Sequence, residues 1–334
     1  MTLTHKIYDD LQQSLKDGDH KTLSKLYTTQ KGVSLIFAME RDTDMRSLFF
    51  TIDDISLEDI PRCKGLSLEK VHLYEYSPVD FFLQISQNKD GEEYIYEVIV
   101  EDIRKDIEEV PYGNNLIPRV SKLLLKWKTF FSQDKTLLLS PEKQQGLFGE
   151  LLFLKQLILL KGCHALSHWT GYEQETHDFY VEGNAYEIKT TSTKAPYKMH
   201  ISSEYQLDDK EVDKDLYVNF YALRKSVSDG KTLPELIEEL QSYFVDYPLL
   251  QKKFEEGLNK YGYFFGLEDK YGTGYHIREE QTFMVKDGFP RITKESLNVG
   301  VSKCTYDVSV ETAVPYRVSE EEKVLILKGS ETNG

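Results

Sequence analysis

The chain has 334 residues, with 41 lysines and arginines against 56 aspartates and glutamates, so its formal charge is −15. This charge and the 40% of hydrophobic residues suit one large or two ordinary globular domains, and exclude wholesale disorder, a collagen-like repeat and a pure coiled coil. Three scattered cysteines are too few for a disulfide framework. We find no signal peptide and no apolar stretch that would cross a membrane, and therefore expect a cytoplasmic protein.

The charge is distributed unevenly along the chain. Residues 1–114 carry 13 basic and 23 acidic side chains, residues 115–207 carry 11 and 9, and residues 208–334 carry 17 and 24. Binding to nucleic acid depends on lysine and arginine contacts to phosphate, so the middle third is the part best suited to it. The N-terminal third, at net −10, favours contact with a protein.

The N-terminal part is predicted to be rich in β-strands. After one helix near the start, residues 32–100 alternate short apolar runs with Asp, Gly and Asn, which predicts antiparallel strands. Prolines, a glycine and two asparagines in residues 108–118 indicate a boundary. We expect a β-rich domain over residues 1–113, for recognition or protein contact, a second domain over 114–318, and a flexible tail over 319–334 in which residues 324–327 offer an edge strand.

The second domain is predicted to mix helices and strands. Residues 116–131 have the apolar spacing of a helix, and Ser140 with Pro141 predicts the N-cap and first turn of another helix that ends near Leu160. Further predicted strands span residues 216–223, 275–285 and 304–310, and further predicted helices span residues 233–244 and 248–258. This order of elements predicts an α/β domain.

Glu150 lies on the apolar face of the helix that begins near Pro141. The apolar stripe of this helix contains Leu147, Leu151, Leu154 and Ile158. A buried carboxylate needs a hydrogen-bonded, cationic or metal partner, because removing it from water alone costs several kcal/mol. A buried Lys or Arg would answer this need as well as a metal ion would.

A β-hairpin is predicted over residues 177–190, with Gly183-Asn184 as its two-residue turn. In that register Glu182 pairs with Ala185, and Asp178 shares a face with Glu187 and Lys189. The β-carbons of Asp178 and Glu187 would lie roughly 7 Å apart as diagonal neighbours. Two carboxylates at this separation suit a hard cation, Mg²⁺ or Mn²⁺, with water in the other positions. The opposite face is apolar and suited to packing: Phe179, Val181, Tyr186 and Ile188.

The tripeptide of an acid, any residue and lysine is not specific by itself, because it occurs six times in the chain. A solvated strand face with an incidental ion pair is therefore an alternative. What distinguishes Glu187 is its position in an apolar hairpin, with Asp178 on the other strand and Glu150 on a helix just upstream.

This combination resembles the active-site pattern of the PD-(D/E)XK nuclease superfamily, which includes type II restriction endonucleases. The closer likeness is to a bacterial family that is assigned to this superfamily by description and is often encoded beside restriction and modification genes. The successive sequence motifs of that family resemble residues 146–152, 169–171, 177–179, 187–191 and 201–207 of this chain. The likeness covers most of the chain. His177 departs from the pattern, since it stands where the superfamily name has proline.

The resemblance implies a restriction-endonuclease-like core, in which a mixed central sheet is flanked by helices. It further implies that Asp178 and Glu187 bind Mg²⁺, or Mn²⁺, together with the Ile188 carbonyl. Lys189 would lower the pKa of the attacking water or hold it in line, and Glu150 would complete the cation shell.

Other residues are weaker candidates. Gln206, in a helix predicted to start at Ser202 or Ser203, is either an accessory residue or a local cap. His177 is a candidate phosphate contact, but strand alternation directs it away from Asp178 and favours a packing role. Three lysines are candidate DNA contacts or ordinary solvated surface: Lys143, Lys194 and Lys198.

The resemblance thus implies a metal-dependent DNA endonuclease that leaves 5′-phosphates and serves a restriction or anti-phage defence system. Its expected partners are DNA, a second copy of the chain, and an ATPase or helicase and a methyltransferase of that system. The alternative is a non-catalytic subunit that keeps the fold and binds DNA or protein, which the charge of −15 favours. A glycosidase with paired carboxylates is disfavoured, because Lys189 would hold both acids ionised when one must donate a proton.

Overall fold

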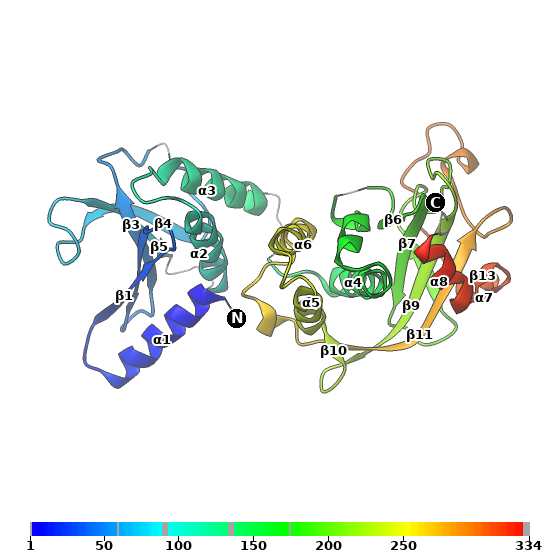
Figure 1. Cartoon of the computed structure of the whole chain (residues 1–334), viewed down its shortest axis with the longest axis horizontal. Helices are drawn as coiled ribbons and strands as arrows, with labels where there is room; N and C mark the ends of the chain where they lie inside the picture. Colours follow the sequence, from blue (N-terminus) through cyan, green and yellow to red (C-terminus); the bar gives the residue numbers. More distant parts are fainter. Residues whose placement is uncertain (1, 59, 89–92, 133–136, 174, 330–334) are drawn as a thin grey trace. The chain divides into compact units, whose positions relative to one another are not determined.

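The computed structural model describes residues 2–58, 60–88, 93–132, 137–173 and 175–329, which form two compact units (Figure 1). The first unit comprises Met1–Leu137 with Phe264–Glu268, and the second comprises Leu138–Tyr263 with Asp269–Gly334. The division therefore falls after residue 137 and not after residue 113. The reason is that helix α3 (Ile117–Ser132) belongs to the first unit, where the Trp127 indole donates a 2.9 Å hydrogen bond to Asp102.

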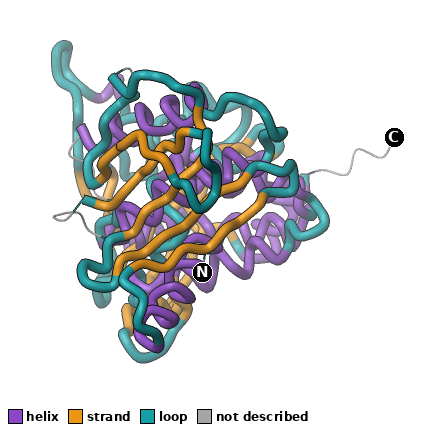
Figure 2. The backbone as a smooth tube through the Cα atoms, turned by 90° about the vertical axis from the view of Figure 1, so that its left-hand side faces the viewer, coloured by secondary structure: helices purple, strands orange, loops and turns teal. Residues whose placement is uncertain are grey.

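The first unit is a five-stranded antiparallel sheet with strand order β1-β2-β3-β5-β4 (Figure 2). The strands are β1 (Thr22–Thr28), β2 (Ser34–Glu40), β3 (Arg46–Ile52), β4 (Leu66–His72) and β5 (Phe81–Gln87). Tyr8 of α1 (Leu3–Asp17) packs edge-on against Phe37 of β2 and against Tyr96 of α2 (Glu93–Glu108). The predicted antiparallel strands after one helix are confirmed, but residues 93–100 belong to helix α2 and not to a strand.

The second unit is an α/β fold built on a mixed sheet with strand order β10-β11-β9-β7-β6, and β13 pairs with β11. Only β7 and β9 pair in parallel in that order. Its strands are β6 (Phe179–Val181), β7 (Asn184–Thr191), β9 (Leu216–Ser226), β10 (Lys231–Thr232), β11 (Gly274–Val285) and β13 (Arg317–Val318). Two more strands, β8 (Lys198–Ile201) and β12 (Tyr306–Ser309), form a separate antiparallel pair.

Helices and the small sheet cover this mixed sheet. Phe153 of α4 (Pro141–Lys161) contacts Phe179 and Tyr186, with ring centroids 4.9 and 5.1 Å away, which confirms the apolar face of the hairpin. Val218 and Phe220 of β9 lie in a buried cluster with residues of β8, β12 and α7 (Val310–Ala313). The remaining helices are α5 (Leu233–Ser242), α6 (Pro248–Tyr261) and α8 (Glu320–Lys328). None of the described helices has the length and apolar character needed to cross a membrane.

The hairpin turn lies one residue earlier than predicted. The turn residues are Glu182 and Gly183, with φ of 53° and 84°, the left-handed pair of a type I′ turn. The observed strand pairs are Phe179 with Tyr186, Tyr180 with Ala185, and Val181 with Asn184. Extending this register by one residue places Asp178 opposite Glu187 and not opposite Lys189. The partner of each residue on β6 therefore moves by two positions along β7. Because side chains alternate with a period of two, Glu187 and Lys189 still lie on the predicted face.

Two other predictions are wrong. Residues 320–328 form helix α8 and are neither a flexible tail nor an edge strand, because the buried ammonium of Lys323 pairs with Glu280 of β11 and fixes the helix. Residues 330–334 of the predicted tail lie outside the described residues. No helix begins at Ser202 or Ser203, since residues 204–207 form a turn.

Gly149 sets the distance between α4 and the sheet. A Cβ added at this glycine would lie 2.3 Å from Thr190 Cγ2, and the nearest strand thus occupies the space that a side chain needs. In an unhindered helix, replacing glycine by alanine stabilises by about 1 kcal/mol. At Gly149 the close approach of Thr190 reverses the sign of this stability change, so alanine is destabilising there.

We expect Gly149→Ala to destabilise the chain by about 1–3 kcal/mol, because overpacking forces α4 and β7 apart. Urea unfolding measures the difference. Gly272→Ala is the matched control, since nothing lies within 4 Å of its added Cβ. A Gly149→Ala variant as stable as the wild type would contradict the close packing.

Candidate active site

The four principal residues of the predicted site lie close together in the second unit. Glu150 comes from α4, Asp178 from the bend before β6, and Glu187 and Lys189 from β7. The exposed fractions are 6% for Glu150, 2% for Glu187 and 9% for Lys189, whereas Asp178 is partly exposed. Three carboxylates and one ammonium group therefore share a largely buried region.

Lys189 is held by two acceptors. Its Nζ forms an ion pair with Glu187 Oε1 at 2.9 Å and donates a hydrogen bond to Gln206 Oε1 at 2.8 Å. The same oxygen of Gln206 accepts the Ser202 backbone N–H at 2.8 Å. Gln206 therefore caps its own turn and also contacts Lys189, and its accessory role in the site stays a prediction.

Glu150 is held by neutral donors. The buried Trp169 indole donates to Glu150 Oε2 at 2.8 Å, and the hydroxyl of Tyr261, at the end of α6, donates to the same carboxylate. Within the described residues no lysine or arginine hydrogen-bonds to Glu150. The buried Lys or Arg partner that the sequence allowed is therefore not what satisfies this carboxylate.

Gly171 leaves room for two carboxylates. A Cβ added here would lie 2.5 Å from Glu150 Oε2 and 3.1 Å from Asp178 Oδ1. The other oxygen of Asp178, Oδ2, accepts the Ile188 backbone N–H at 2.7 Å. The Thr170 and Gly171 backbone N–H groups donate to the Asp178 carbonyl at 2.9 and 3.1 Å and fix its backbone.

Burial and mutual repulsion raise the pKa values of two of these acids. Burial raises the pKa of Glu150 to about 7, the charge of Glu187 adds to the rise, and the hydrogen bonds from Trp169 and Tyr261 offset part of it. The pKa of Asp178 lies well above its usual range, first because of burial and then because of the charges of Glu187 and Glu150. Such shifts are typical of functional sites.

His177 lies at the site and not in the surrounding core. It is 3% exposed, and its Nδ1 is 3.7 Å from Glu187 Oε2. The alternation that directed it away from Asp178 does not apply, because residues 176–178 form a bend before the strand begins. The Thr170 hydroxyl donates to the His177 carbonyl at 2.9 Å and holds this bend.

The donor atoms suit a hard divalent cation, although no three His, Cys, Asp or Glu side chains of the described ranges converge to hold one. The internal donors explain this arrangement, since Lys189 holds Glu187 Oε1 and the Ile188 N–H holds Asp178 Oδ2. The second oxygen of each, Glu187 Oε2 and Asp178 Oδ1, accepts no hydrogen bond from the residues described. Free carboxylate oxygens are the ligands that Mg²⁺ and Mn²⁺ prefer, so the donor set fits such an ion.

The candidate DNA-contact lysines lie on the surface. Lys143 is in the first turn of α4, Lys194 follows β7 and Lys198 begins β8. All three are exposed, and within the described part of the chain none forms an ion pair. Their side chains are available to a polyanion.

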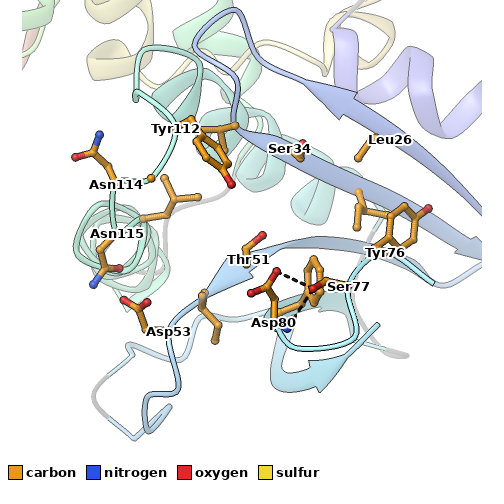
Figure 3. A pocket seen from close by; sticks show the side chains of 16 residues that line it. Leu26, Ser34, Thr51, Asp53, Tyr76, Ser77, Asp80, Tyr112, Asn114 and Asn115 are labelled. Atoms are coloured by element: carbon orange, nitrogen blue, oxygen red, sulfur yellow. Dashed lines mark hydrogen bonds between the residues drawn. The ribbon is translucent and has the colours of Figure 1, made fainter. Parts of the chain in front are cut away.

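A cavity of about 480 Å³ lies in the first unit (Figure 3). Ile36 and Phe82 of the sheet line it together with Tyr112, and Asp53 and Asp80 add two carboxylates. Its described lining contains no lysine, arginine or histidine. The cavity is therefore poorly suited to phosphate groups.

Residues 4–311 match the family described as "Putative PD-(D/E)XK family member, (DUF4420)". The chain belongs to this family. The resemblance found in the sequence is thus confirmed, and the match extends through both units. No curated protein and no solved structure matches the chain.

The sequence did not reveal which residues support the site of this family member. The block at residues 169–171 was part of the resemblance, but nothing in its sequence indicated that Trp169 and Gly171 contact Glu150. Tyr261 gave no signal at all, because it reaches Glu150 from a helix far along the chain. The roles of the ligands and of the Ile188 carbonyl stay predictions.

The raised pKa of Glu150 makes stability depend on pH. Between about pH 4.5, its ordinary value, and about pH 7, the folded chain binds more protons at this group than the unfolded chain does. The contribution of protonated Glu150 to the free energy of unfolding is complete below about pH 4.5 and is lost as the pH rises through 7. In EDTA, we expect the unfolding temperature of the wild type to fall more steeply between pH 5 and 8 than that of Glu150→Gln.

Thermal unfolding followed by circular dichroism measures this slope. Glu175→Gln, a change of the same kind at an exposed position, should keep the wild-type slope. Identical slopes for the wild type and Glu150→Gln would contradict the raised pKa.

Proposed function

We propose that the chain is a metal-dependent DNA endonuclease with a restriction-endonuclease-like core, acting in a restriction or anti-phage defence system. The observation that carries the proposal is the network of Glu150, Asp178, Glu187 and Lys189 on a mixed sheet, in a member of the PD-(D/E)XK-related family. The reaction is hydrolysis of a phosphodiester bond: water attacks phosphorus, the bond to the 3′ oxygen breaks, and the 5′-phosphate remains on the other product.

Asp178, Glu187 and the Ile188 carbonyl would hold Mg²⁺, or Mn²⁺, and Glu150 would complete the shell directly or through water. When bound, the ion stabilises charge on the phosphate and helps to form hydroxide. The raised pKa values of Glu150 and Asp178 support this assignment, because a cation relieves the repulsion that raises them.

Lys189 would stabilise the attacking hydroxide. Its ammonium is fixed by Glu187 and Gln206, so its position does not depend on the substrate. A positive charge next to the water favours the anionic form and lowers its pKa. Gln206 acts on the reaction through Lys189 and is a positioning residue.

The surface lysines would bind DNA, and the first unit would bind a protein partner. Lys143, Lys194 and Lys198 lie in the least acidic third of the chain and would contact DNA phosphates. The first unit would instead contact a protein, because the described lining of its cavity presents Asp53 and Asp80 and no cationic side chain. A second copy of the chain, or an ATPase, helicase or methyltransferase of the defence system, would be that protein.

The alternative is a non-catalytic subunit of such a system. Two observations favour it. The ion pair of Lys189 with Glu187 occupies a carboxylate oxygen that a metal ion would need, and the charge of −15 repels DNA. Against it, a chain without catalysis has no need to keep two buried acids and a partly exposed one beside a lysine, an arrangement that opposes folding.

We expect plasmid cleavage in Mg²⁺ or Mn²⁺ to fall about a hundredfold or more in Asp178→Asn and in Lys189→Met, because each removes a charge that acts on the reacting groups. Methylated and unmethylated DNA are tested, with and without proteins from neighbouring genes. The control is Asp213→Asn, which changes an exposed aspartate outside the network.

Two results would overturn this function. Cleavage that survives in Asp178→Asn and Lys189→Met would separate the activity from this site. No cleavage under any condition, together with no metal binding that depends on Asp178, would leave the non-catalytic subunit.

The lysine assignment predicts a change in salt dependence. Replacing Lys143, Lys194 and Lys198 by alanine should weaken DNA binding and reduce the slope of log K against log salt by about 0.9 for each phosphate that the variant no longer neutralises. Fluorescence anisotropy with a duplex measures the slope. A variant with three exposed lysines of the first unit replaced, Lys16, Lys21 and Lys31, carries the same charge change and should keep the wild-type slope.

A further inference from the structure

His177 has a buried nitrogen atom without a partner. The side chain is 2% exposed, and Nδ1 forms no hydrogen bond. Among the described residues, the charged atom within 4 Å of it is Glu187 Oε2, and the 3.7 Å between them is too long for a hydrogen bond. A buried polar atom left unpaired costs about 1–3 kcal/mol, so this nitrogen needs a physical explanation.

The imidazole is also held in this position. The Thr170 hydroxyl fixes the His177 carbonyl at 2.9 Å, and the Tyr180 ring packs edge-on with its centroid 5.9 Å away. Lys189 binds the opposite oxygen of Glu187, Oε1, and so leaves Oε2 directed toward the histidine side. The two atoms thus lie 3.7 Å apart on two side chains that other contacts hold in place.

The separation of these atoms is compatible with a shared divalent cation. Metal–nitrogen and metal–oxygen bonds of about 2.0–2.2 Å span at most about 4.3 Å when the ligands lie opposite each other. A separation of 3.7 Å therefore corresponds to a bent arrangement, and it requires no large movement of either group.

We propose that His177 Nδ1 is a ligand of the divalent cation, which it shares with Glu187, and that it makes the site prefer a first-row transition metal such as Mn²⁺ over Mg²⁺. The inference rests on the metal site of the proposed function. Mg²⁺ prefers oxygen ligands alone, whereas imidazole nitrogen strengthens the binding of transition metals. The coordinating form is the neutral ring with its proton on Nε2.

The test uses the full chain, freed of metal and titrated with Mn²⁺ or Mg²⁺ by calorimetry. We expect the wild type to bind Mn²⁺ more tightly than Mg²⁺, and His177→Asn to lower this preference at least tenfold by weakening Mn²⁺ binding. Asparagine puts an oxygen where Nδ1 lies, so Mg²⁺ binding should change less than twofold. His200→Asn, at an exposed histidine paired with Asp307, is the matched control and should keep the preference.

Pulsed electron paramagnetic resonance of bound Mn²⁺ gives a second readout, which in the wild type needs no variant to fold. Nitrogen coupling from one imidazole should be present in the wild type and in His200→Asn, and absent in His177→Asn. Binding of Mn²⁺ that depends on Asp178 but shows no nitrogen coupling would overturn the role of His177 and leave the nuclease proposal intact. If no Mn²⁺ binding is lost in Asp178→Asn, both proposals fail together.

Discussion

The close placement of three carboxylates in a largely buried region is the constraint on which the rest of this site depends. Desolvation and mutual repulsion both oppose it, and they raise the pKa values of Glu150 and Asp178 for these two reasons. Among the described residues, Lys189 is the only lysine or arginine that forms an ion pair with these acids, and it pairs with Glu187 alone. One ammonium does not neutralise three carboxylates, so a bound cation would stabilise the fold as well as act on a substrate.

The chain tolerates this repulsion in part because neutral donors fix two of the acids separately. The Trp169 indole holds Glu150, and the Ile188 backbone N–H holds Asp178. The backbone of residues 170–171 then anchors the bend that carries Asp178, and the missing side chain of Gly171 gives two carboxylates room. Residues of the segment between α4 and β6 therefore position the carboxylates of Glu150 and Asp178, and a block of the family pattern lies in that segment.

Local periodicity predicted which face of a helix or strand is buried better than it predicted how the hairpin strands pair. Glu150 on the apolar stripe of α4 and the apolar face of the hairpin both follow from spacing, and both are buried as expected. The turn was misplaced because Gly183 was taken as its first residue, whereas Glu182 adopts the other left-handed position. Helix α2 was missed because its isoleucines and valines favour strands, although its apolar residues recur at helical spacing: Ile95, Ile99, Ile103 and Ile107.

The supporting contacts could not be predicted, because they join elements that are distant in sequence or depart from regular geometry. Tyr261 reaches Glu150 from α6, and no local pattern encodes that contact. His177 was assigned to packing by assuming a strand that begins before it, but the bend at residues 176–178 turns it toward Glu187. A periodic pattern assumes regular backbone, and functional sites are where backbone is least regular. The acids and the lysine of this site therefore follow from sequence, whereas the groups that hold them follow only from the folded chain.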